Sequence, residues 1–143
     1  MPSEAAKKAR ALVQEQKVHC AQAVLTAHGE ELGSGKIDHE TLLKISSAFS
    51  GGIARQGNVC GAVTGALMAL GLKHGGQDSR KADEVAVMFL REFKTLHGTV
   101  NCRELINHDL VTDADVQKAF KTGAFKDCPK FVEDAVVLLE KLL

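Results

Sequence analysis

Residues 58–76, which read NVCGAVTGALMALGLKHGG, decide the fold that the sequence predicts. Asn is a favoured residue at the N-cap of a helix, so we expect a helix that follows Asn58 and runs to about His74. The pair Gly75-Gly76 ends it, since glycine is common just past the last turn of a helix. Counted from Asn58, Cys60 lies in the first turn. The segment therefore predicts a helix that carries a cysteine at its start.

The same start and stop signals recur along the whole chain. No alternating strand pattern of useful length, internal repeat or linker interrupts them. We therefore predict one all-α domain over residues 1–143, a single-domain helical bundle of about six helices. The expected helices lie between Ser3 and Gly33, Asp38 and Gly52, Asn58 and Gly75, Asp78 or Ser79 and Gly98, and Thr112 and Gly123. A short one begins at Asn101, and Asp127-Cys128-Pro129 opens the last.

The amino-acid composition argues against nucleic acid and anionic membranes as partners. The 143 residues include 18 Lys and Arg against 18 Asp and Glu, so no net charge steers the chain toward nucleic acid or an anionic membrane. Trp and Tyr are absent, which removes the aromatic platforms on which single-stranded bases stack. A hydrophobic content of 45% is enough for one ordinary core. We expect no nucleic-acid partner.

The N-terminal and apolar segments predict the compartment. Residues 1–8, MPSEAAKK, are charged and lack the apolar stretch of a secretory signal. The longest weakly polar run, 62–72, is too short to cross a bilayer. We expect a cytoplasmic protein with no membrane insertion. Reducing cytosol argues against permanent disulfides, and favours metal ligation, reversible redox chemistry or plain burial for the four cysteines.

The four cysteines are far apart in sequence. Cys60, Cys102 and Cys128 fall beside expected helix starts, where free N–H groups and the helix dipole stabilise a thiolate. Cys20 shares a helix face with Val24 and is expected to point inward. No pair has Cys-x-x-Cys spacing, so the sequence contains no zinc ribbon, thioredoxin-like dithiol or haem-attachment motif. From the spacing alone, the four cysteines are about as well explained as buried core residues with no chemical role as by a functional site.

Several other residues near the cysteines have either a functional or a purely structural interpretation. Gly61 and Gly65 lie on one side of their helix, where missing side chains admit a cofactor or another backbone, and helix packing is the favoured reading for Gly65. Arg55 and Arg103 either lower the pKa of nearby thiols or are surface charges. Because successive helical residues diverge by about 100°, we expect His19 at the surface.

Five segments together carry a family resemblance. They are HCAQAV at 19–24, FSGG at 49–52, CGAVTG at 60–65, NCREL at 101–105 and Cys128 at the last helix start. The chain resembles, over nearly its whole length, the redox-active family named for its Cys-Gly-Ala-x-x-Gly motif and four cysteines (C_GCAxxG_C_C). Similar domains occur in c-type haem proteins of the split-Soret kind.

The resemblance implies a redox role for the four family cysteines. In the split-Soret relatives such cysteines look like an iron–sulfur site, which implies the same for Cys20, Cys60, Cys102 and Cys128. This chain lacks every Cys-x-x-Cys-His motif, so we expect no covalent haem.

The preferred hypothesis is an electron-transfer protein in which the four cysteines converge and bind an iron–sulfur cluster of the two-iron (2Fe-2S) type. Gly61 and Gly65 would let the cofactor approach the helix, and electrons would pass to an unidentified redox partner protein. Two alternatives stay open: a metal-free dithiol/disulfide redox protein, and a non-catalytic helical module with a structural zinc site. Exposed apolar faces or glycine seams also allow a homodimer. The sequence does not decide whether the chain is an enzyme.

Overall fold

A computed structural model describes all 143 residues and confirms the all-α prediction, with eight α-helices, one 3-10 helix and no strand. The elements are α1 (Glu4–Gln14), α2 (Cys20–Leu32), α3 (His39–Ser46), η1 (Ser47–Phe49), α4 (Gly61–His74), α5 (Arg80–His97), α6 (Cys102–Leu105), α7 (Asp113–Thr122) and α8 (Cys128–Lys141).

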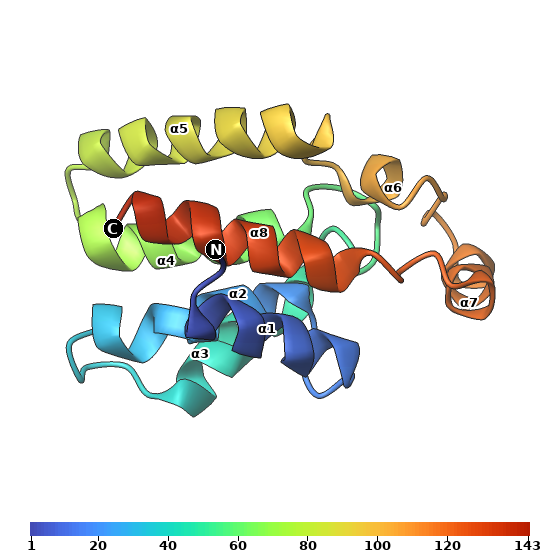
Figure 1. The fold of residues 1–143 in the computed structure, drawn as a ribbon, viewed down its shortest axis with the longest axis horizontal. Helices are drawn as coiled ribbons and strands as arrows, with labels where there is room; N and C mark the ends of the chain where they lie inside the picture. The colour runs from blue at the N-terminus through green and yellow to red at the C-terminus, as the bar shows by residue number, and fades with distance from the viewer.

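Helix α4 lies at the centre of the bundle. Its residues are apolar on every side, which is typical of a helix enclosed by its neighbours. Helix α2 packs along it, and α8 contacts both. Figure 1 shows α5 along one long side, α1 and α3 on the opposite side, and α4 and α8 between them. The short helix α6 and helix α7 form one end of the molecule (Figure 1).

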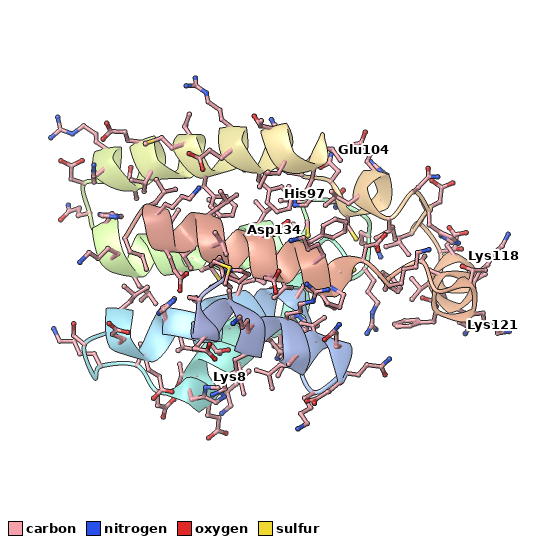
Figure 2. All side chains as sticks on the ribbon, in the orientation of Figure 1. Lys8, His97, Glu104, Lys118, Lys121 and Asp134 are labelled. Carbon is pink, nitrogen blue, oxygen red and sulfur yellow. The ribbon has the colours of Figure 1, made fainter.

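Helix α5 closes one side through a regular apolar stripe. Val85, Phe89 and Phe93 are four residues apart, lie on one face, and are buried. At the end of this helix His97 lies beside Asp134 of α8 (both labelled in Figure 2). Its Nε2 is 3.0 Å from Oδ2 of Asp134. Burial of each phenylalanine contributes about 2 kcal/mol to stability. None of the eight helices combines the length and apolar character needed to cross a bilayer.

The first expected helix is in fact two helices, α1 and α2. The chain turns after α1, where Gln16 has a φ of 57°. His19 is extended and precedes α2, and its N–H donates to the Gln22 side chain at 3.2 Å. The prediction of one long helix was wrong because no glycine, proline or strong cap residue marks this turn. Cys20 therefore begins a helix, and all four cysteines lie at helix starts.

Helix α4 starts later than its cap signal predicts. It begins at Gly61, three residues after Asn58, because the intervening residues are extended. Val59 pairs with Asn101 in an isolated antiparallel bridge, and this pairing competes with helix formation. The split of the first expected helix adds one helix to the segments named from the sequence, the short helix at Asn101 included, and gives eight helices where about six were expected.

Candidate functional site

The four cysteines come from four separate helix starts. Cys20, Cys102 and Cys128 are the first residues of α2, α6 and α8, and Cys60 directly precedes α4. Cys60 and Cys102 are each 5% exposed, whereas Cys20 and Cys128 are partly buried. All four are free thiols. Each sulfur therefore lies near the end of a helix that has unpaired N–H groups.

These four cysteines line one cavity of about 760 Å³. Burial is the largest cause of the raised pKa of Cys60, and the charges of Cys20, Cys102 and Cys128 raise it further. Burial also raises the pKa of Cys102 and of Cys128; the charge of Cys20 adds to both shifts, and that of Cys102 adds to the shift of Cys128. Every pair of cysteines is thus within electrostatic reach. The structure brings together four residues that span 109 positions of sequence, from 20 to 128.

A pair of backbone hydrogen bonds places Cys60 beside Cys102. The N–H of Cys60 donates to the carbonyl of Val100 at 2.7 Å, and the N–H of Cys102 donates to the carbonyl of Asn58 at 2.7 Å. These bonds flank the bridge between the two extended segments. Because backbone bonds of this kind do not depend on side chains, the two helix starts are held in fixed register.

A loop with unusual backbone geometry surrounds Cys20. Residues 51–55 have five consecutive positive φ angles, between 50° and 73°. Three of them, Ile53, Ala54 and Arg55, carry side chains, for which this region costs about 1–2 kcal/mol each. Burial raises the pKa of the Cys20 thiol, and the backbone amides of Gly51, Ala21 and Gly61 act in the opposite direction. The strained loop therefore brings the amide of Gly51 close enough to act on this cysteine.

The two glycines of the hexapeptide have different neighbours. A Cβ on Gly61 would overlap the sulfur of Cys20, so this glycine lets Cys20 lie against the start of α4. A Cβ on Gly65 would lie 2.6 Å from the carbonyl oxygen of Ala21 and 3.2 Å from Cβ of Val24. Neither glycine lines the cavity. Gly65 serves the close packing of α2 on α4.

All four thiols have raised pKa values, which reverses the expectation that the helix starts favour thiolates. Burial is the largest cause at every position. It raises the pKa of Cys102 to about 12 and that of Cys60 well above its usual value. Amide donors do lower the pKa of Cys20, but burial outweighs them. Neither Arg55 nor Arg103 is among the leading causes of these shifts, and burial keeps the cysteines protonated at pH 7.

His19 is a cavity residue that the sequence placed at the surface. Its Nε2 lies 3.0 Å from the carbonyl oxygen of Ser47, which requires a proton on Nε2. The other ring nitrogen, Nδ1, is buried without a hydrogen-bond partner. Burial and the charge of Arg55 lower the pKa of His19. The sequence did not indicate this position of His19, because no residue marks the break between α1 and α2 that lies just before Cys20.

The donor set does not form a site for a single ion. No group of three or more His, Cys, Asp or Glu side chains is arranged around one metal position anywhere in the chain. The cysteines share a cavity and electrostatic contact, but they do not make a tetrahedral cage.

A family model matches most of the chain. The family described as "Putative redox-active protein (C_GCAxxG_C_C)" matches residues 18–142, which include all four cysteines. Comparison with curated proteins and with solved structures gives no match.

Proposed function

The chain belongs to the C_GCAxxG_C_C family of redox-active proteins, and we propose that its four cysteines bind an iron–sulfur cluster of the two-iron type and that the protein transfers electrons. One observation carries this proposal. Four free cysteines from four helix starts line a single cavity. A two-iron cluster requires four thiolates, and this chain has four cysteines in all.

The shape of the donor set favours a cluster over zinc. A structural zinc ion needs four ligands around one point, and no three suitable side chains surround such a point here. In a two-iron cluster each iron takes only two protein thiolates, because bridging sulfides complete its coordination. Cys20, Cys60, Cys102 and Cys128 would hold the group, which would supply one-electron chemistry there.

The surrounding amides suit a buried group with negative charge. Although burial raises the pKa of Cys20, the backbone amides of Gly51, Ala21 and Gly61 lower it and so favour negative charge on its sulfur. Hydrogen bonds to ligand sulfur stabilise the more negative, reduced state and raise the reduction potential. When bound, the cluster supplies reversible one-electron chemistry. The chain's own residues fix the sulfurs, exclude bulk water from Cys60 and Cys102, and offset charge at Cys20.

Raised thiol pKa values weigh against the metal-free alternative. Thiol–disulfide exchange requires a thiolate, and burial keeps all four cysteines protonated at neutral pH. A metal can displace such protons, because the bond to thiolate compensates for the cost of ionisation. The site is thus better suited to ligation than to disulfide exchange.

Substitution of single cysteines tests the proposal. Cys60→Ser is expected to lose most of the iron and labile sulfide that the native chain retains after anaerobic reconstitution. Ala66→Ser is the matched control, since it places the same side chain in α4 at a buried position that does not line the cavity. Native iron and sulfide content in Cys60→Ser would refute the assignment. Circular dichroism shows whether each variant is folded.

A further inference from the structure

The cysteine cavity is larger than a cluster requires. Its volume is about 760 Å³. At about 30 Å³ per atom, the four inorganic atoms of a two-iron cluster would fill on the order of 120 Å³. The whole cavity falls in the range of about 300–1,000 Å³ that is typical of sites for small organic ligands. Most of the space is therefore free for a second occupant.

The charges around this cavity have one sign. None of its lining residues is Asp or Glu, whereas Lys17, Arg55 and Lys126 all line it. Lys17 has a carboxylate partner, Glu15, at 3.4 Å. Arg55 and Lys126 form no ion pair with any carboxylate of the chain. Two cations at the cavity are thus free to bind an anion.

Aromatic side chains lie beside these cations. The rings of Phe120 and Phe125 are 4.9 Å apart between centroids, and both line the cavity. The guanidinium of Arg55 lies 5.5 Å from the centroid of the Phe120 ring. Phe120 is 56% exposed, so a large apolar surface stays in water when the cavity holds no organic ligand.

We propose that the cavity binds a small organic anion with an aromatic or other flat apolar part, held by Arg55 and Lys126 through its charge and by Phe120 and Phe125 through its apolar part. This inference rests on the proposed function in one respect. The cysteines of the same cavity are the redox group, and the ligand would bind next to them. A ligand of this class would lie beside the four cysteines, because they line the same cavity.

A pair of fluorescent probes tests the proposal on the full chain. Anilinonaphthalene sulfonate carries an aromatic body and one negative charge, whereas phenylnaphthylamine has the same body without the charge. We expect saturable binding of the sulfonate to the reduced protein, about tenfold tighter than the neutral probe, and weakened by salt. Competition by benzoate and by phenyl phosphate then shows which anionic group the cavity prefers.

Variants locate the binding. Arg55→Gln and Lys126→Gln are each expected to weaken sulfonate binding about three- to fivefold and to leave the neutral probe unchanged. Phe120→Ala is expected to weaken both probes. Lys8→Gln is the control, because Lys8, labelled in Figure 2, is an exposed lysine of α1. It lines a different cavity. Weakening by Lys8→Gln alone, or equal affinity of the native protein for both probes, would overturn the proposal.

The same samples separate this inference from the proposed function. Sulfonate binding without any reconstituted iron would refute the cluster and leave the anion site intact. Full iron and sulfide content without preference for the charged probe would refute the anion site alone.

Discussion

Substitution of Gly61 by alanine tests the contact between the start of α4 and Cys20. A Cβ on Gly61 would overlap the sulfur of Cys20, and it would lie 2.9 Å from the carbonyl oxygen of Phe49 and 3.0 Å from the nitrogen of Ala21. Backbone atoms cannot move aside cheaply, so Cys20 must shift. Gly71 is the matched control, because it belongs to the same helix and a Cβ there meets no atom within 4 Å.

The two substitutions should change stability in opposite directions. Alanine is favoured over glycine in a helix by about 0.5–1 kcal/mol, so Gly71→Ala should stabilise the protein by that amount. Forcing a methyl group into a filled space costs about 1–3 kcal/mol, which leaves Gly61→Ala destabilised by about 1–2 kcal/mol. For a chain of this size, about 3 °C per kcal/mol gives a fall of roughly 3–6 °C in Tm for Gly61→Ala and a rise of roughly 2–3 °C for Gly71→Ala.

Thermal and urea unfolding of the reduced apoproteins, followed by circular dichroism, measures both changes. Reconstituted iron content should fall in Gly61→Ala and stay native in Gly71→Ala, because only the first displaces a ligand sulfur. Equal stabilisation of the two variants would show that Cys20 does not lie against Gly61, and the account of the motif glycine would fail.

Three further predictions concern the thiols and the strained loop. Alkylation of the folded, reduced chain by iodoacetamide should still accelerate above about pH 10, since burial raises the thiol pKa values, and a plateau near neutral pH would contradict this. The apoprotein should lose stability as pH rises from about 9, the ordinary thiol pKa, toward about 12, the folded pKa of Cys102, because the unfolded chain releases thiol protons that the folded chain retains. Cys102→Ala should flatten this decline in urea titrations at alkaline pH. Ala54→Gly should stabilise the protein by about 1 kcal/mol in urea, because Ala54 is exposed and has a φ of 50°; destabilisation would mean that the loop is not strained there.

Local signals were enough to predict the helical fold. Ser3 caps α1 by accepting from the N–H of Ala6 at 3.1 Å, and Gly98 and Gly123 follow α5 and α7 with left-handed φ angles of 84° and 71°. Such caps depend on neighbours in sequence, so a single chain reveals them. The turn before Cys20 has no such marker, which explains why α1 and α2 were read as one helix.

The site depends on contacts that a single sequence does not show. Val59 pairs with Asn101 across 42 positions, and this bridge sets Cys60 beside Cys102. Burial of the thiols is likewise a property of the assembled bundle, so the helix starts alone predicted the wrong direction for their pKa values. The hexapeptide that begins at Cys60 indicated the four cysteines as the candidate site. Only the fold shows that they line one cavity.

Anaerobic reconstitution with iron and sulfide, followed by analysis of iron, labile sulfide and zinc and by coulometric reduction, tests the cluster most directly. We expect about two irons and two sulfides per chain, no zinc, and uptake of about one electron. One zinc with no redox response, or two-electron reduction of a metal-free chain, would contradict it.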